Sequence, residues 1–578
     1  MSDPSAALSG RGVSPGVVQG IAFVVVADCY STVPRRIIAE SEVGAELEKF
    51  DAALQAAERD LLALRERVER RIGKQEAEIF AAQALVLKDP LLLKEVLHLV
   101  SHEKRNVEAA LTDIIAKFAQ VFSEIQDPYL QARASDIRDV GRRVLSILMK
   151  TQCGDTLSCP EGSIVVGEEL LPSATAHMHL QNVAGFVTER GSKTSHASIL
   201  ARSMGVPLVV GVEGACSRIR TGDLLIVDGT TGKVVINPGP RLLREYDKRR
   251  AQGQAEHDVL EGLADLPSVT ADGTPIRLCA NVAKLDDLET VDHCKADGIG
   301  LLRTEFLFMA HDRFPTEEEQ FAFYRTASER LNPREVTIRV LDLGGDKTLP
   351  YFPLPATLNP SLGHRGTRLL LNHPEILETQ LRAILRASAF GKVRVLLPMV
   401  IGTEDVVAAK AVLGRAKEFL RYSGIRFDEA IRVGAMIEVP SAVIMVQRIA
   451  REVDFLSVGT NDLIQYLLTV DRTSPELAPY YDSLHPAVLE TIRGLAAAAG
   501  EAGRELSLCG EMAADERYTP LLIGLGVRSF SVVPGRILRV RSSIRSTSVA
   551  LSEKLAPRAL KLASGQAVMK LLRAGSKG

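Results

Sequence analysis

One histidine in this sequence stands where a side chain can accept and carry a phosphoryl group. His196 follows the polar stretch Gly191-Ser-Lys-Thr-Ser195 and precedes an apolar run, residues 197–201, that predicts a helix. In the first turn of a helix, free backbone N–H groups and the helix dipole favour an anion. Neutral imidazole is also a nucleophile near pH 7. The same pattern suits a histidine that only caps or packs a helix, so both interpretations stand at this point.

Polar side chains able to bind or react follow most of the short apolar runs in the C-terminal half. Arginine binds phosphate and carboxylate through a planar fork, and paired carboxylates next to a phosphate require a bridging cation such as Mg²⁺. Phosphoryl transfer depends mainly on positioning and charge neutralisation, which such a set supplies. Strand ends are often polar because they meet solvent, but solvent contact does not explain this concentration of chemistry. The set comprises Arg303, Arg339, Lys347, Glu438, Asn461, Asp462, Arg472 and Cys509.

The C-terminal half, which must position these side chains, alternates between predicted strands and predicted helices. Eight apolar runs occur in the last 310 residues, and helical segments separate most of them. They are residues 276–282, 298–302, 336–343, 393–400, 433–438, 455–459, 506–509 and 528–533. Eight such units predict a (β/α)8 barrel, whose functional residues gather at the C-terminal strand ends. An open, doubly wound sheet is the alternative fold.

The first half predicts a multidomain α/β chain with an inserted helical bundle. Residues 9–28 indicate a turn and a strand at 21–27, and short strands return between about 160 and 237. Between them, helical spacing at 46–70 and 107–125, with breaks at Asp89-Pro90 and Asp127-Pro128, favours a bundle over a solvated coiled coil. Residues 241–263 predict a linker helix or a simple surface helix. The expected domains are 1–30 with 152–238, the insertion 31–151, the linker 239–265 and the barrel 266–578.

Composition excludes several classes of function. The chain of 578 residues is 46% apolar and 25% charged, with a net charge of −2, which argues against a general nucleic-acid or membrane-surface role. No apolar run approaches the ~20 residues of a membrane span, and the N-terminus lacks signal-peptide features. The seven cysteines are scattered without paired Cys-x-x-Cys motifs. These features predict a cytoplasmic protein with mostly inert thiols.

Several motifs together resemble one family. Thr194-Ser-His-Ala-Ser-Ile-Leu-Ala-Arg-Ser-Met-Gly-Val-Pro207 is similar to the phosphohistidine signature of enzymes that use phosphoenolpyruvate (PEP). The segments at 298–309, 341–347, 359–365, 381–391, 457–463 and 508–511 resemble the PEP-binding barrel of enzyme I of the bacterial phosphotransferase system. Pyruvate phosphate dikinase and PEP synthase carry a nucleotide-binding domain ahead of the signature. Here fewer than 200 residues precede it, without a Walker-type loop.

The resemblance to enzyme I implies a complete catalytic set. It implies that His196 takes the phosphoryl group of PEP, that Thr175 hydrogen-bonds its ring and that Cys509 protonates the enolate to give pyruvate. Glu438 and Asp462 would hold Mg²⁺. The groups implied to bind phosphate and carboxylate are Arg303, Arg339, Lys347, Arg365, Asn461, Asp462 and Arg472.

The resemblance also implies partners. The bundle would dock the small carrier HPr, the barrel would form a homodimer, and His196 would reach PEP and HPr by a domain swing about the linker helix. Three departures occur in the expected docking face: Ala81 and Lys88 stand where acidic residues are usual, and Gln83 stands where histidine is expected. Ser192 and Ile537-Leu538 also depart from the family pattern. A regulatory phosphate relay and a slow PEP sensor remain as alternative functions, although intact His196 and Cys509 argue against the sensor.

Overall fold

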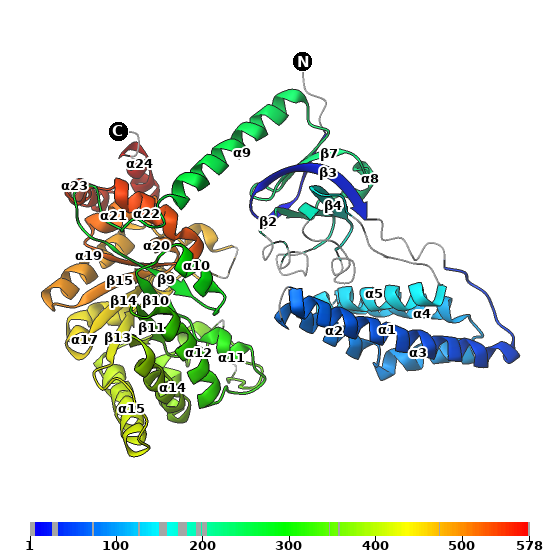
Figure 1. Ribbon diagram of the computed structural model, residues 1–578, viewed down its shortest axis with the longest axis horizontal. Helices are drawn as coiled ribbons and strands as arrows, with labels where there is room; N and C mark the ends of the chain where they lie inside the picture. Colours follow the sequence, from blue (N-terminus) through cyan, green and yellow to red (C-terminus); the bar gives the residue numbers. More distant parts are fainter. Residues whose placement is uncertain are drawn as a thin grey trace. The chain divides into compact units, whose positions relative to one another are not determined.

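The computed structural model forms two compact units, Met1–Gly253 and Gln254–Gly578 (Figure 1). The structure describes residues 6–25, 33–71, 74–124, 128–149, 159–170, 182–191, 198, 201, 205–345, 347–355, 359–472, 474 and 476–575. His196 and Thr175, together with most of the helix predicted at 197–201, lie outside this range. Among the described residues, no helix combines the length and the apolar character needed to cross a membrane.

The second unit contains a closed barrel of eight strands in its described residues, and each strand runs parallel to its neighbours. Closure excludes the open sheet and confirms the predicted barrel. The predicted runs 298–302 and 455–459 match their strands at both ends. The strands are β9 (Arg277–Val282), β10 (Gly298–Leu302), β11 (Glu335–Arg339), β12 (Val393–Leu397), β13 (Arg432–Ile437), β14 (Phe455–Gly459), β15 (Glu505–Cys509) and β16 (Ser529–Val532).

Two strands end three or four residues before the end of the apolar runs that predicted them. β11 stops at Arg339, because the N–H groups of Leu341 and Asp342 bond to side chains rather than to a neighbouring strand. β12 stops at Leu397, because Pro398 has no N–H and Met399 adopts a φ of 53°. In both places the apolar composition reflects burial of the loop that follows the strand.

Helices surround the barrel, and most turn an apolar face toward the strands (Figure 1). Inside the strands, Leu301, Leu396, Met436 and Phe455 form a buried cluster with Cys509. The helices of this unit are α10 (Asp287–His293), α11 (Glu305–Met309), α12 (Glu317–Leu331), α13 (Thr367–Asn372), α14 (Pro374–Ala387), α15 (Thr403–Tyr422), α16 (Pro440–Ile444), α17 (Val446–Glu452), α18 (Thr460–Leu467), α19 (Pro486–Glu501), α20 (Glu511–Ala514), α21 (Thr519–Gly524), α22 (Ile537–Ser546), α23 (Val549–Leu560) and α24 (Gly565–Gly575).

A network of ion pairs occupies the N-terminal ends of the barrel strands. Arg394 is buried, and its Nη1 lies 3.1 Å from Glu335 and 2.9 Å from Glu505. Its guanidinium stacks 4.1 Å above the Phe455 ring, and Arg277 pairs with the same two carboxylates. This network, which we call the barrel floor, lies at the opposite end of the strands from the polar residues singled out above.

The first unit contains an eight-stranded sheet in its described residues, with the order β1-β8-β7-β3-β4-β5-β6-β2. Strands β3 and β4 are parallel neighbours, yet helices α1 to α5 separate them in the sequence. The bundle is therefore inserted between two paired strands. The strands are β1 (Ala6–Ser9), β2 (Arg11–Ser14), β3 (Val17–Val25), β4 (Ser163–Gly167), β5 (Val183–Thr188), β6 (Leu208–Val210), β7 (Leu224–Asp228) and β8 (Lys233–Ile236). The short helix α8 (Ala215–Arg218) follows β6.

The bundle has its own apolar core, which includes Phe50, Leu61, Val96, Leu111 and Leu145. Its helices are α1 (Val43–Arg71), α2 (Lys74–Val86), α3 (Pro90–Ser101), α4 (Val107–Glu124) and α5 (Pro128–Met149). Helices α3 and α5 begin at the prolines of the predicted breaks, and the Asp89 carboxylate accepts from the backbone N–H groups of Leu91 and Leu92. The helix predicted at 46–70 lies within α1, and the one predicted at 107–125 overlaps α4.

One sequence-based assignment in the bundle is wrong. Gln83 was placed on the docking face, but its side chain is fully buried and its Nε2 donates to Asp139 Oδ2 at 3.0 Å. Position 83 lies on the inner side of α2, so its side chain cannot contribute to an exposed face of the bundle. Lys88, by contrast, has a side chain that is 62% exposed.

Helix α9 (Pro240–Glu261) follows the sheet, where the prediction placed a linker. Its first turns pack Leu242, Leu243 and Tyr246 against the sheet residues Ile226 and Val235. Beyond its last turn, the carbonyls of Leu263 and Ala264 accept hydrogen bonds from the buried Arg541 in α22.

Candidate active site

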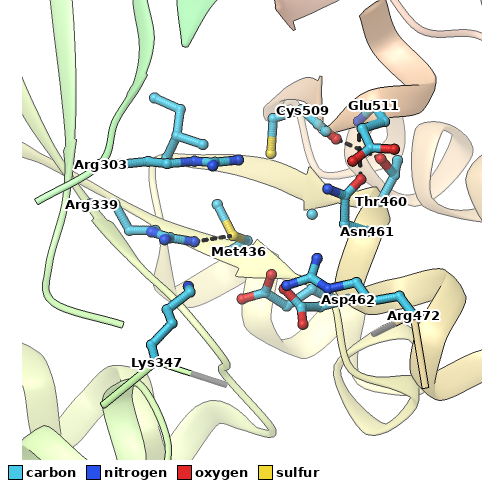
Figure 2. A pocket seen from close by; sticks show the side chains of 14 residues that line it. Arg303, Arg339, Lys347, Met436, Thr460, Asn461, Asp462, Arg472, Cys509 and Glu511 are labelled. Atoms are coloured by element: carbon cyan, nitrogen blue, oxygen red, sulfur yellow. Dashed lines mark hydrogen bonds between the residues drawn. The ribbon is translucent and has the colours of Figure 1, made fainter. Parts of the chain in front are cut away.

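The polar strand ends of the barrel line one cavity of about 230 Å³ (Figure 2). Arg303 directly follows β10 and Arg339 ends β11, whereas Asn461 and Asp462 lie in the first turn of α18 and Cys509 ends β15. The cavity is lined by Leu301, Arg303, Arg339, Lys347, Met436, Glu438, Gly459, Thr460, Asn461, Asp462, Arg472, Cys509, Gly510 and Glu511. Four cationic side chains thus face a small space together with three carboxylates.

The two arginines differ in what holds them. Arg339 is buried, and its Nη2 donates to Glu305 Oε1 at 2.5 Å while its Nη1 lies 3.5 Å from Asp342. Burial alone would lower the pKa of Arg339, but the carboxylates of Glu305 and Asp342 raise it above the usual value. Arg303 pairs with no carboxylate in the described part of the chain, and its buried Nε lacks a partner there. Its guanidinium is therefore suited to an anion from outside the protein.

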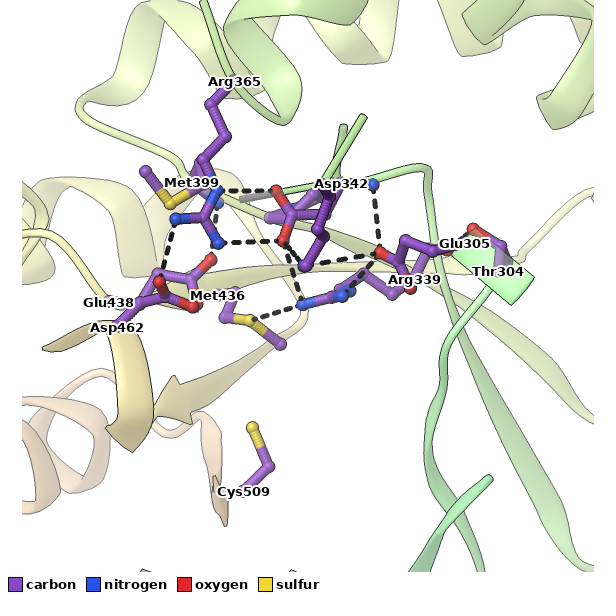
Figure 3. Close-up of polar contacts among 12 residues, drawn as sticks. Thr304, Glu305, Arg339, Asp342, Arg365, Met399, Met436, Glu438, Asp462 and Cys509 are labelled. Atoms are coloured by element: carbon purple, nitrogen blue, oxygen red, sulfur yellow. Dashed lines mark hydrogen bonds and ion pairs between the residues drawn. The ribbon is translucent and has the colours of Figure 1, made fainter. Parts of the chain in front are cut away.

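A buried carboxylate, Asp342, organises the cations on one side of the cavity (Figure 3). It accepts from Lys347 Nζ and, at 3.2 Å, from both Nε and Nη2 of Arg365. Burial opposes ionisation, but these cations and Arg339 lower the pKa of Asp342. Arg365 Nη1 also donates to Asp462 Oδ1 at 2.9 Å. Arg365, which does not itself line the cavity, thus connects Asp342 with Asp462.

Glu438 and Asp462 provide the carboxylate oxygens that a cation needs. Glu438 is buried, and its Oε1 accepts from the Met399 N–H at 2.8 Å. Burial, together with repulsion from Asp462 and Asp342, raises the pKa of Glu438 to about 7. A Cβ at Gly459 would lie 2.3 Å from Glu438 Oε2, so glycine leaves room for this carboxylate. Acids gathered so closely fit a divalent cation, which would neutralise them.

Cys509 ends β15 and points its thiol into the cavity (Figure 2). Its Sγ donates to the Val458 carbonyl at 3.2 Å and lies 3.6 Å from Ser457 Oγ. Burial raises the pKa of the Cys509 thiol to about 11, so it keeps its proton at neutral pH. Next to it, Gly510 has a φ of 104°, and a Cβ there would lie 2.2 Å from Thr460 Oγ1. The turn therefore requires glycine to bring Asn461 and Cys509 to the same rim.

The structure brings most of the expected site residues together. Eight of them line the cavity: Arg303, Arg339, Lys347, Glu438, Asn461, Asp462, Arg472 and Cys509. Arg365 lies behind them, and His196 and Thr175 fall outside the described residues. Sequence reasoning did not select Glu305, Asp342 or Met399, which hold the cations and Glu438 in place. For the two acids a signal existed, because each stands within three positions of a strand-end arginine.

Curated proteins of nearly the same length are similar to this chain along almost its whole sequence. The chain is 38% identical over 570 residues to the phosphoenolpyruvate-protein phosphotransferase of Staphylococcus carnosus, covering 99% of each chain. It is also 38% identical over 571 residues to the enzyme of the same name from Geobacillus stearothermophilus, covering 98% of this chain and 99% of the relative. The chain belongs to the phosphoenolpyruvate-protein phosphotransferase family.

Domain families agree with this membership. The PEP-utilising enzyme, PEP-binding domain matches residues 258–549, which include the whole barrel. The N-terminal and mobile domains of PEP-utilising enzymes match residues 9–133 and 159–232. A solution structure of an Enzyme I protein is 33% identical, with a TM-score of 0.35, over 43% of this chain and 99% of that one. A phosphoenolpyruvate-protein phosphotransferase needs one site for PEP, and the cavity falls within the PEP-binding domain.

Proposed function

We propose that PEP binds in this cavity, that His196 takes its phosphoryl group, and that the group then passes to a histidine of an HPr-type carrier. In the first step a neutral ring nitrogen of His196 attacks phosphorus, the bond from phosphorus to the enol oxygen breaks, and enolpyruvate leaves. A proton added to the CH₂ carbon of that enolate gives pyruvate. The second step transfers the phosphoryl group from one imidazole to another. The pathway is the first stage of the sugar phosphotransferase system.

The observation that carries this proposal is the arrangement of charge around the cavity. Four cations, Arg303, Arg339, Lys347 and Arg472, line a space of about 230 Å³ at the C-terminal ends of the strands. PEP carries a phosphate and a carboxylate, both of which suit bidentate arginine contacts. The phosphohistidine signature supplies an acceptor elsewhere in the chain. We assign Asn461 and Arg472 to the same anionic groups and Thr175 to the His196 ring.

We further propose that Glu438 and Asp462 hold Mg²⁺. Repulsion among these acids supports this, because a bound cation would relieve it. Mg²⁺ often takes one or two protein carboxylates and completes its shell with substrate oxygens and water. When bound, it would neutralise charge on the transferred phosphoryl group. Arg365, joined to Asp462, would keep that carboxylate aimed at the cavity.

The direct test is a transfer assay with the purified chain. Radiolabelled PEP should label the protein alone, release one pyruvate for each phosphoryl group taken, and label a purified HPr-type carrier when it is added. A chain that binds PEP but never acquires acid-labile, alkali-stable phosphate would contradict the assignment to phosphohistidine. Labelling without onward transfer to any HPr-type carrier would contradict the proposed partner.

Cys509 is proposed as the proton donor, and alanine in its place should slow pyruvate formation by about 10²–10⁴-fold, as expected for a lost general acid. The loss should appear in kcat, with little change in KM, because the thiol acts in the transition state. Since the thiol pKa is about 11, this group should cause no loss of rate until the pH approaches that value. A coupled lactate dehydrogenase assay measures both constants.

Cys279→Ala is the matched control for Cys509→Ala. Cys279 lies in β9 and is also buried, but it does not line the cavity. Its loss should lower thermal stability without lowering kcat. If Cys509→Ala changed KM alone, or if both variants lowered kcat equally, Cys509 would be a packing residue.

The proposed HPr-docking face lies on the bundle, around Lys88 at the end of α2. Leu85 and Leu91 are 72% and 57% exposed, so large apolar side chains flank this lysine. Lys88 Nζ pairs with Glu58 Oε1 at 2.6 Å, which cancels one acidic charge of α1. A face of this kind should bind a carrier that is less basic than usual around its histidine, because electrostatic complementarity sets on-rate and partner choice.

Lys88→Glu should therefore speed transfer to a foreign carrier with a basic face, while phosphorylation by PEP stays unchanged. The gain should shrink at high salt, because exposed charges are screened over a Debye length of about 8 Å at physiological ionic strength. Lys117→Glu is the control: Lys117 is also exposed and paired, with Glu95 at 2.9 Å, so the net charge changes equally. Equal rates for both variants in a transfer time course would show that overall charge, not this face, matters.

We also propose that the chain acts in the cytoplasm and forms a homodimer through its barrel unit. Buried, unpaired thiols at Cys159, Cys279, Cys294 and Cys509 support a reducing compartment. Large apolar side chains exposed on the barrel unit, such as Ile444, Tyr480 and Leu362, support an interface between copies of the chain.

A further inference from the structure

A buried glutamine outside the cavity connects the two loops that carry Arg303 and Arg339. Gln380 lies in α14, and its side chain is fully buried. Its Oε1 accepts from the Leu341 N–H at 2.9 Å, in the loop after β11. Its Nε2 donates to Thr304 Oγ1 at 3.2 Å, in the loop after β10, and to Tyr324 Oη at 3.0 Å. One amide therefore joins both loops to the helix behind them.

The hydrogen bonds around Gln380 fix the direction of its amide. Thr304 Oγ1 gives its proton to the Arg339 carbonyl at 3.0 Å, so it can only accept from Gln380. A backbone N–H, that of Leu341, requires the oxygen of the amide on the other side. Oε1 of Gln380 must therefore accept and Nε2 must donate. A methylene can do neither, and a carboxylate can only accept, so neither group can replace the amide.

The link acts at the positions next to the arginines. Thr304 directly follows Arg303, and its Oγ1 donates to the backbone carbonyl of Arg339. A second connection runs parallel to the first, because Glu305 Oε1 accepts from the Asp342 N–H at 3.1 Å and from the Arg339 guanidinium. Pairing between β10 and β11 ends at Leu302 and Ile338, directly before the two arginines. Beyond that point, these buried side chains connect the two strand ends and hold the arginines at the spacing that the pairing begins.

We propose that Gln380 is a positioning residue for PEP: it sets the spacing between Arg303 and Arg339, so that both guanidinium groups meet the same substrate. The inference rests on the proposed function of the cavity. Gln380 does not line that cavity and acts only through the two loops. A misplacement of about 1 Å can cost on the order of 10²-fold in rate when a reaction depends on orientation.

The test is Gln380→Met, which keeps the length of the side chain and removes its hydrogen bonds. In the full chain, kcat for phosphorylation by PEP should fall about 10–100-fold, more than KM rises. The decisive comparison repeats the substitution in an Arg303→Ala background. If Gln380 acts by aligning Arg303 with Arg339, the same change should cost much less there, because one of the two groups is already gone. Equal losses in both backgrounds would overturn the proposal.

Tyr324→Phe is the matched control. It removes one bond to Gln380 but leaves the Leu341 and Thr304 connections, so it should lower thermal stability and leave kcat unchanged. If Gln380→Met does not fold, Thr304→Val tests the same link from its other end and should give the same loss in kcat. A loss in Tyr324→Phe as large as that in Gln380→Met would mean a general effect of packing. An inactive wild-type chain would contradict the proposed function, whereas an active Gln380→Met chain contradicts only this inference.

Discussion

Alanine in place of His196 is expected to abolish transfer of radiolabelled phosphate from PEP to the protein, with PEP binding retained. The reason is the division of labour along the chain. The cations proposed to bind PEP line a cavity of the barrel unit, whereas His196, the proposed acceptor, belongs to the first unit. Removing the imidazole of His196 should therefore leave the proposed binding site complete. Labelling by gel and binding by titration calorimetry separate the two effects.

His102→Ala controls for the loss of a histidine as such. His102 is exposed at the end of α3 and should label at the wild-type rate. Label that survives in His196→Ala would identify a different acceptor and remove the basis of the proposed mechanism. Loss of PEP binding in the same variant would instead place His196 in the binding site.

The two strand-end arginines should give different losses. Arg303→Ala and Arg339→Ala should each lower kcat/KM by about 10²–10³-fold, by analogy with a lost oxyanion donor. Arg339→Ala should also destabilise the barrel by about 3–5 kcal/mol, because Glu305 and Asp342 lose a buried cation. Arg303→Ala leaves no buried acid unpaired, so its folding stability should stay close to that of the wild type.

Thermal unfolding of the barrel unit and the pyruvate assay together separate these outcomes. Arg303→Lys should restore only part of the rate, because an ammonium group cannot reproduce the planar fork. Full activity of Arg303→Lys would show that charge alone matters at this position. Equal destabilisation by both alanine variants would show that the ion pairs of Arg339 do not stabilise the barrel.

The barrel and most of its cavity could be predicted from the sequence, because buried parallel strands produce a simple sequence pattern. Buried strands read as short apolar runs, and the residue after each run lies at the same rim. Arg303 directly follows such a run, Glu438 ends one and Asn461 stands two residues after one, so their meeting could be predicted without a structure. The family resemblance added Arg365 and Thr175, whose positions local patterns do not mark.

The residues that support the site could not be predicted from the sequence, because their partners lie far away along the chain and no local pattern marks the contact. Gln380 lies 39 residues from Leu341 and 76 residues from Thr304, in a helix whose apolar spacing gives no hint of a polar contact. Met399 donates its backbone N–H to Glu438 because its φ is 53°, a left-handed conformation that a methionine in the sequence does not predict. Gln83 failed for a different reason: the family resemblance placed this position on the docking face, but the side chain is buried and donates to the Asp139 carboxylate inside the bundle.

The barrel floor affects how a substrate can reach the cavity and how a product can leave it. Arg394 and its partners close one end of the strands, and the side chains of Leu301, Leu396, Met436 and Phe455 fill the space above them. The cavity therefore lies toward the rim of polar strand ends and away from the barrel floor. Under the proposed function, PEP and His196 reach it from that rim and pyruvate leaves by the same side. The phosphorylated imidazole would then have to withdraw before the next PEP can bind.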